Sequence, residues 1–143
     1  MAGFNVLGDV NDTALKRVDV STLTAAIGDL LELVAGATTW AKTTSSTNFF
    51  TRKGILMETL TSASTALILE LDGSEKVEAD ATNTANTAHN GDRMVLTDEN
   101  AVNNTGTDNT GQTACFVQDN TGRNTTKIVG RVIVGSGVDP DAT

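Results

Sequence analysis

A six-residue phrase occurs twice in the chain, and each copy begins with Gly-Asp. Gly28-Asp29 is followed by Leu-Leu-Glu-Leu, and Gly91-Asp92 is followed by Arg-Met-Val-Leu. Glycine accepts a positive φ and an aspartate side chain caps nearby N–H groups, so the pair turns the backbone and the next residues enter a strand. The flanks of the two copies differ, because Trp40 and a Thr/Ser loop follow the first and an Asn-rich stretch follows the second. We therefore interpret the phrase as one type of corner used twice within a single β domain, and not as an internal duplication.

Composition favours many short strands joined by tight turns. The 143 residues include 24 Thr, 12 Asn and 13 Gly; the branched Cβ of threonine suits a pleated sheet, while asparagine and glycine suit turns. A chain of this length fits one domain. We expect an extended N-terminal arm over residues 1–20, a β-rich domain over 21–134, and a C-terminal tail over 135–143.

Hydrophobic alternation and turn residues place the strands inside the β-rich domain. One region is ambiguous: residues 22–35 carry apolar side chains at helical spacing, but Gly28-Asp29 interrupts that pattern, and we favour strands over a helix there. From Gly91 onward, Asn-Thr-Gly turns separate the strands as in a β-meander, and Gly130 marks a bulge or a close backbone approach. A strand is predicted at residues 18–20, where the arm ends, and a hairpin turn at 35–37 leads into a return strand at 38–40. The other predicted strands cover residues 55–57, 65–71, 77–79, 94–97, 115–118 and 127–134.

Charge and composition argue against several classes of partner. The formal net charge is −8 and the pI is about 4.4, which opposes binding to nucleic acid or to an anionic membrane surface. The N-terminus lacks the basic and apolar segments of a signal peptide, and no apolar run has the length of a membrane span. We expect synthesis in a cytoplasm, with neither nucleic acid nor membrane as a partner.

No residue pattern indicates catalysis, a cofactor or a metal. His89, the only histidine, lies beside Asn90-Gly91 and is interpreted as a turn residue, since no nucleophile elbow accompanies it. The oxygen-rich run from Asp98 to Asn109 lacks the glycine and the closing glutamate of a calcium loop, so we interpret it as a solvated turn cluster, with metal binding as the alternative. Cys115 and Trp40 are expected in the core. We expect a protein that is not an enzyme.

Four phrases of the second half can be taken together. They are His89-Asn90-Gly91-Asp92-Arg93-Met94, Val102-Asn103-Asn104-Thr105-Gly106-Thr107-Asp108, Phe116-Val117-Gln118, and the stretch from Val129-Gly130-Arg131 to Gly137-Val138-Asp139-Pro140-Asp141-Ala142-Thr143. With the first Gly-Asp phrase and Trp40, these phrases resemble a small family of tailed-bacteriophage virion proteins, the auxiliary head proteins, also called capsid decoration or cement proteins.

The resemblance implies a mainly β fold, a single small antiparallel β-barrel or β-tulip-like domain that is commonly assembled as a homotrimer. It also implies a partner, the major capsid protein, and a place on the outer capsid surface, where an N-terminal arm engages the shell. Apolar residues of the irregular arm are then the candidate capsid-interface anchors: Phe4, Val6, Leu7 and Leu15. Two alternatives stay open: another virion component (a head-fibre base or a tail protein), or a small hydrolase or carbohydrate-binding module.

Overall fold

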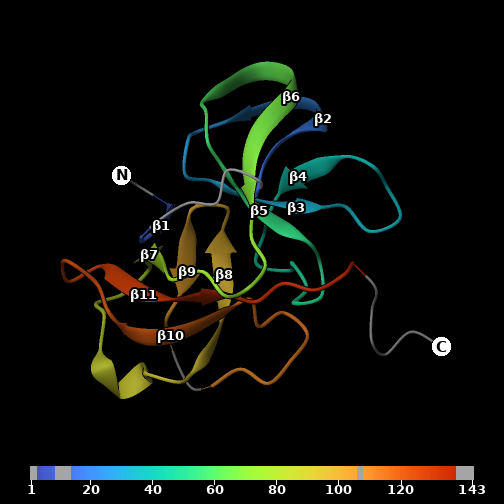
Figure 1. The fold of residues 1–143 in the computed structure, drawn as a ribbon. Coiled ribbons are helices and arrows are strands. Elements are labelled where there is room, and N and C mark those ends of the chain that lie inside the picture. Colours follow the sequence, from blue (N-terminus) through green and yellow to red (C-terminus); the bar gives the residue numbers. More distant parts are fainter. Residues whose placement is uncertain (1–2, 9–13, 106–107, 138–143) are drawn as a thin grey trace.

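The computed structural model describes residues 3–8, 14–105 and 108–137, and within these ranges eleven strands form two sheets (Figure 1). The first sheet has the strand order β2-β6-β5-β3-β4, and all its pairs are antiparallel. Its two edge strands, β2 and β4, lie close together without pairing, so the sheet is a nearly closed barrel. Its strands are β2 (Leu15–Ala25), β3 (Leu30–Leu33), β4 (Trp40–Lys42), β5 (Lys53–Leu56) and β6 (Leu60–Glu70).

The second sheet is a closed barrel in the order β7-β11-β10-β8-β9, because β9 pairs with β7 in parallel. A further strand, β1 (Phe4–Val6), lies antiparallel to β7. A single turn of 3₁₀-helix, η2 (Thr87–His89), precedes β8. The strands of this barrel are β7 (Val77–Ala81), β8 (Arg93–Asp98), β9 (Ala101–Asn103), β10 (Phe116–Thr121) and β11 (Lys127–Val132).

The expected small β-barrel domain is confirmed, but the chain builds two barrels where we expected one. Both have the same connectivity, since numbering the strands of each barrel from one to five gives the order 1-5-4-2-3 in both. The register also agrees: Leu31 pairs with Gly54 in the first barrel and Met94 pairs with Phe116 in the second, and each is the second residue after its Gly-Asp pair. Our rejection of an internal duplication was therefore wrong, because the differing loops conceal two copies of one strand arrangement.

The first Gly-Asp corner leads from β2 into β3. Gly28 has a φ of +95°, its N–H donates to the Leu56 carbonyl (2.9 Å), and the Leu56 N–H donates to the Asp29 carbonyl (2.8 Å). The Asp29 side chain is buried and accepts a hydrogen bond from the Ala26 N–H (3.0 Å). Burial raises the pKa of this carboxyl above its usual value. The predicted turn and cap are thus both present, and they join β3 to β5.

The second corner repeats these backbone hydrogen bonds at the start of β8. Gly91 has a φ of +90°, its N–H donates to the Gln118 carbonyl (2.7 Å), and the Gln118 N–H donates to the Asp92 carbonyl (3.1 Å). The Asp92 side chain contacts His89 instead of capping an amide. Both corners therefore start the second strand of a barrel and tie it to the fourth.

One glycine in each barrel makes room for a large side chain on a neighbouring strand, and the two barrels place it on opposite strands. A Cβ on Gly54 of β5 would lie 2.8 Å from Ile68 Cδ1 in β6, and a Cβ on Gly130 of β11 would lie 2.9 Å from the Phe116 ring in β10. Gly54 is equivalent to Phe116, and Ile68 to Gly130. The close backbone approach predicted for Gly130 is confirmed, because the same Cβ would also clash with the Val117 carbonyl.

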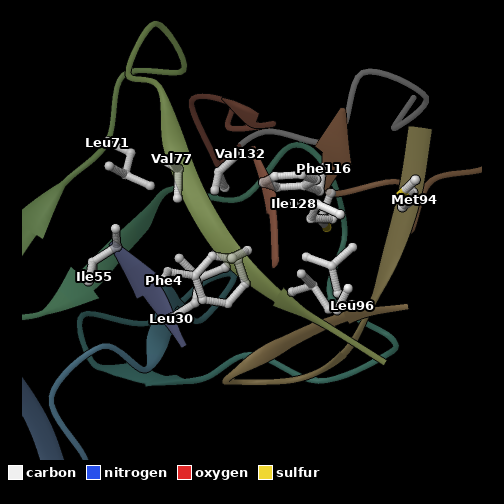
Figure 2. Close-up of a cluster of buried hydrophobic side chains, with 14 residues drawn as sticks. Phe4, Leu30, Ile55, Leu71, Val77, Met94, Leu96, Phe116, Ile128 and Val132 are labelled. Atoms are coloured by element: carbon white, nitrogen blue, oxygen red, sulfur yellow. The ribbon is translucent and has the colours of Figure 1, made fainter. Parts of the chain in front are cut away.

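Each barrel has its own buried core. The inner face of the first barrel holds a cluster around Trp40, as predicted, and Arg52 lies over its ring at 5.7 Å. The second cluster fills the second barrel and continues onto the outer face of the first, where Leu30 and Ile55 join it (Figure 2). It also contains Cys115, which is fully buried, as predicted. The two barrels therefore share one apolar contact.

Strand β1 lies at this contact and not on a free arm. Phe4 pairs with Ala79 of β7, while its N–H donates to the Gly28 carbonyl of the first corner (2.8 Å). Its side chain is fully buried beside Leu30 (Figure 2). The expectation of an arm over residues 1–20 is corrected for the part described, because β1 belongs to one sheet and Leu15 already begins β2 of the other.

The ambiguous segment 22–35 is extended, which confirms the strand interpretation and shows that the helical spacing was misleading. It contains the end of β2, the first corner and β3. At the other end of the chain, the Gly135 N–H donates to the Thr51 carbonyl (3.2 Å) and the Gly137 N–H to the Phe50 carbonyl (2.8 Å), so residues 135–137 are attached to the loop before β5. The rest of the predicted tail, residues 138–143, lies outside the described residues.

The Phe4→Ala variant tests whether β1 joins the barrels. Removing a fully buried phenylalanine leaves a cavity in the shared cluster, so we expect the free energy of unfolding to fall by about 3–5 kcal/mol. Urea denaturation measures this change. Leu7→Ala is the control, because Leu7 is partly exposed and should change stability by about 0.5 kcal/mol or less; equal effects of the two variants would contradict the placement of Phe4.

The Gly130→Ala variant tests the close approach of β10 and β11. The added methyl overlaps Val117 and Phe116, and such overpacking costs about 1–3 kcal/mol. Gly36→Ala is the matched control, since its φ is +75° but nothing lies within 4 Å of the new Cβ; we expect a loss of about 1 kcal/mol from backbone strain alone. Thermal denaturation compares them, and a Gly130→Ala protein as stable as the parent would refute the overlap.

Candidate interaction surface

An apolar groove lies beside β1, where the first corner meets the end of β5. Its volume is about 60 Å³, which admits one or two methyl groups of a partner's side chain. Only one of its lining residues has a polar side chain, Asn5. The groove is lined by Phe4, Asn5, Val6, Ile27, Ile55, Leu56, Met57 and Leu69.

Two large apolar side chains stand at or next to this groove and face solvent. Ile27 is 42% exposed and lines the groove, and Leu7 is 36% exposed and directly follows the groove residue Val6. Their backbones are held in place, because the Leu7 N–H donates to the Lys76 carbonyl (2.8 Å) and the Ile27 N–H to the Thr59 hydroxyl (3.3 Å). Exposed apolar side chains beside a preformed depression suit contact with another protein.

The four predicted interface residues lie at or near the groove, but they differ in what they expose. Phe4 lines it as a buried core residue, so its proposed part as an anchor in direct contact with a partner is corrected. Val6 lines it and is half-buried, and Leu7 is exposed next to it. Leu15 is half-buried at the start of β2 and pairs with Leu69, which lines the groove.

Sequence analysis missed Ile27 and Met57 as groove residues. Ile27 immediately precedes the first Gly-Asp corner, and a large apolar residue at a turn is a usable signal for an exposed contact. We had placed it only in the ambiguous segment 22–35, among the apolar residues at helical spacing. Nothing in the sequence shows that this corner lies against β1, because the contact joins residues far apart in the chain.

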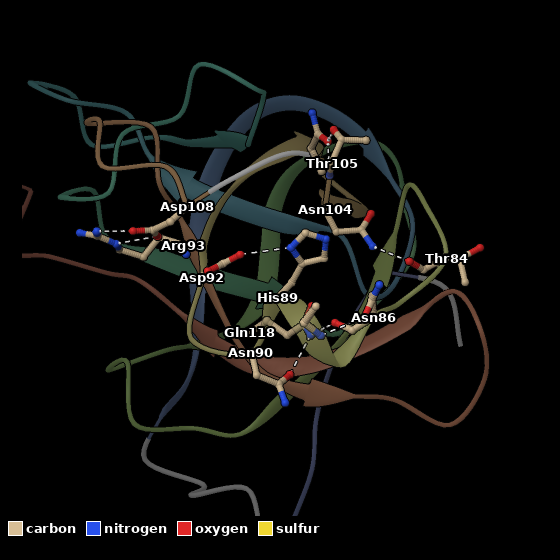
Figure 3. A network of polar contacts seen from close by, with 12 residues as sticks. Thr84, Asn86, His89, Asn90, Asp92, Arg93, Asn104, Thr105, Asp108 and Gln118 are labelled. Carbon is tan, nitrogen blue, oxygen red and sulfur yellow. Dashed lines mark hydrogen bonds and ion pairs between the residues drawn. The ribbon is translucent and has the colours of Figure 1, made fainter.

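A polar network surrounds the second corner at the equivalent place (Figure 3). His89 Nδ1 lies 3.1 Å from Asp92 Oδ2, and Gln118 Nε2 donates to the Asn86 carbonyl and to Asn90 Oδ1, both at 2.9 Å. The Gln118 Oε1 atom is buried and accepts no hydrogen bond from the described residues. The network fixes the turn that contains η2.

This network does not form a recognisable catalytic or metal site. Among the described residues, no hydroxyl or thiol hydrogen-bonds to the His89 ring, and no group of three or more His, Cys, Asp or Glu side chains converges on one point. In the Asp98–Asn109 run, Asp98 and Asn103 accept hydrogen bonds from the N–H groups two residues later. Side-chain oxygens that accept these hydrogen bonds form Asx turns. These turns agree with the interpretation of the run as a turn cluster.

An ion pair closes the loop that follows β9. The Arg93 guanidinium donates two hydrogen bonds to the Asp108 carboxylate, at 2.7 and 3.1 Å, and the Arg93 N–H donates a third at 2.7 Å (Figure 3). These bonds lower the pKa of Asp108 to about 2. The charged side chains beside the second corner therefore hold the loop after β9 in place.

Comparison with protein-family models, curated proteins and solved structures finds no match for this chain. Within the described residues, no helix has the length and apolar character needed to cross a membrane.

The acid titration of Asp108 tests the loop closure. Because its folded pKa of about 2 lies below the ordinary value of 3.8, its contribution to stability is present above about pH 4 and is lost as the pH falls through 2. Arg93→Gln should move the pKa of Asp108 up toward the ordinary value, as followed by NMR of the carboxyl carbon. Arg131→Gln, which removes the separate pair with Asp119, is the control; a pKa near 4 for Asp108 in the parent protein would contradict the pairing.

Proposed function

We propose that this protein is a capsid decoration protein, a structural protein that binds the outside of a tailed-bacteriophage head and stabilises the junctions between capsomers. The sequence phrases that resemble auxiliary head proteins support the proposal. The two corners in those phrases are conformationally specific elements of the fold, with positive φ at Gly28 and Gly91. The proposed partners are the major capsid protein and further copies of the chain in a homotrimer.

The observation that carries the proposal is the apolar groove with Ile27 and Leu7 exposed beside it. A binding protein needs apolar side chains that meet a partner without first unfolding, and both of these are held by hydrogen-bonded backbone. Many copies on one shell make a modest affinity at each site sufficient. The net charge of −8 favours a protein partner over the nucleic acid packed inside a head.

The aromatic residues do not favour the carbohydrate-binding alternative. Sugar-binding sites use exposed aromatic rings as flat contact surfaces, and the chain has one Trp and no Tyr. Trp40 is buried in the first barrel and stacked under Arg52, so its faces are occupied. A protein of the tail or of a head-fibre base would use the same kind of apolar contact. Imaging of the particles distinguishes these locations from the head.

Binding of purified protein to heads that lack it tests the proposal. Changing both Leu7 and Ile27 to aspartate places two charges on the apolar contact. We expect the affinity to fall at least about tenfold, since each buried apolar side chain contributes about 1.5–3 kcal/mol. Val34→Asp is the control, because Val34 is a 39% exposed apolar residue that directly follows β3 and does not line the groove. The connection from β3 to β4 lies on the side of the molecule away from β1 (Figure 1).

Electron microscopy of particles incubated with the protein gives the location. Density on the outer shell that is reduced for the double variant supports the proposal. Labelling confined to the tail or to fibre bases would assign the protein to another virion structure, and the absence of binding by the parent protein to any part of the particle would refute a virion role.

A further inference from the structure

The strand that begins each barrel has a different neighbour in the two copies. Equivalent positions follow from the pairing: Ile68 and Gly130 are equivalent residues of β6 and β11, Ile68 pairs with Lys16, and Gly130 pairs with Val77. Lys16 of β2 is therefore equivalent to Val77 of β7, and the two residues after each correspond in the same way.

In the second barrel the outer edge of residues 77–79 is occupied. Strand β1 pairs there, with Asn5 opposite Glu78, and Glu78 is only 2% exposed. The equivalent edge in the first barrel, residues 16–18, which we call the β2 edge, pairs only with β6 on its inner side. No backbone group of the described residues bonds to its outer side. One barrel thus shows an added strand, and the other has the same position open.

The β2 edge carries positive charge where the equivalent edge of the second barrel is acidic or apolar. Arg17 stands where the second barrel has Glu78, and next to it Lys16 stands where the second barrel has Val77. The Arg17 and Lys16 side chains are 55% and 41% exposed. Arg17 contacts Glu58 and Thr65 through Nη1 alone, so Nε and Nη2 have no partner among the described residues. These two nitrogens form the fork that binds a carboxylate with two hydrogen bonds.

The same charges disfavour a second copy of this edge as the partner. Two β2 edges paired antiparallel about Arg17 would place Arg17 opposite Arg17 of the other copy, with Lys16 of each copy beside this contact. Like charges opposite each other destabilise a pair of strands, and lysine on an open edge is a known protection against self-association. The edge therefore suits a different segment, one that carries a carboxylate.

We propose that the β2 edge binds an extended acidic segment of a partner protein by strand addition. The segment runs antiparallel to Lys16–Val18, as β1 runs against β7, with an aspartate or glutamate opposite Arg17 and an apolar residue opposite the half-buried Val18. Main-chain hydrogen bonds supply the affinity, and the Arg17 fork selects the acidic side chain. None of Lys16, Arg17 and Val18 lines the groove beside β1.

Two synthetic peptides test this. One has the sequence of residues 3–7 with aspartate in place of Asn5, and the other has lysine at that position. In NMR titrations of the full chain, we expect the aspartate peptide to shift the amides of Lys16–Val18 and to bind at least tenfold more tightly than the lysine peptide. Neither peptide needs a phage head, so the result does not depend on the proposed function.

Arg17→Gln is the variant that isolates the fork. It keeps the backbone edge and removes the charge, so we expect the preference for the aspartate peptide to fall below threefold while the parent spectrum is otherwise retained. Equal binding of the two peptides to the parent protein, shifts at residues 77–79 in place of 16–18, or the absence of shifts would each overturn the proposal. An unchanged preference in Arg17→Gln would overturn the assignment of the fork.

Discussion

The contact made by Phe4 determines how the two halves of this molecule are arranged. Its backbone pairs with β7 of the second barrel, its N–H bonds to the corner of the first, and its ring fills the shared cluster between Leu30 and the second barrel. Three residues of strand thereby connect both barrels. Both proposed surfaces depend on this contact, because the groove is lined by β1, and the β2 edge is recognisable as open only by comparison with the edge that β1 occupies.

The duplicated barrel shows which parts of the arrangement are essential and which can change. Backbone bonds at the two Gly-Asp corners are the same in both copies. Side chains at equivalent positions are mostly different, and the glycine that makes room for Ile68 in one copy and Phe116 in the other has changed strands. At this pair of neighbouring positions on adjacent strands, one residue must be small so that the other can be large. Either strand can supply the small residue, because the two side chains fill one shared volume.

The local structure could be predicted from the sequence because its causes are local. The turns at Gly28 and Gly91, the small residue at Gly130 and the burial of Trp40 all follow from residue type and neighbours. The strand at Leu30–Leu33 was harder, since its apolar spacing also fits a helix, and pairing with β5 decided the outcome. The arm was mispredicted because the partner of Phe4 is Ala79, and no local pattern contains that information. The groove was missed for the same reason. The duplication was missed because we compared the sequences that flank the two corners, whereas the likeness lies in how the strands pair.

The position of β1 also has a consequence for how the chain is made. Strand β1 is synthesised before the other strands, yet its pairing partner follows more than seventy residues later, as in the hydrogen bond from Gly3 to Asp80. The first barrel can close on its own cluster while the second is still being synthesised, but its outer face, with Leu30 and Ile55, stays uncovered until β7 arrives. The N-terminal strand can therefore complete its pairing with β7 only after the start of the second barrel has been synthesised. A chain interrupted before β7 would lack both the partner of β1 and the residues that cover Leu30 and Ile55. We expect such a product, with an apolar surface and an unpaired strand, to be prone to aggregation.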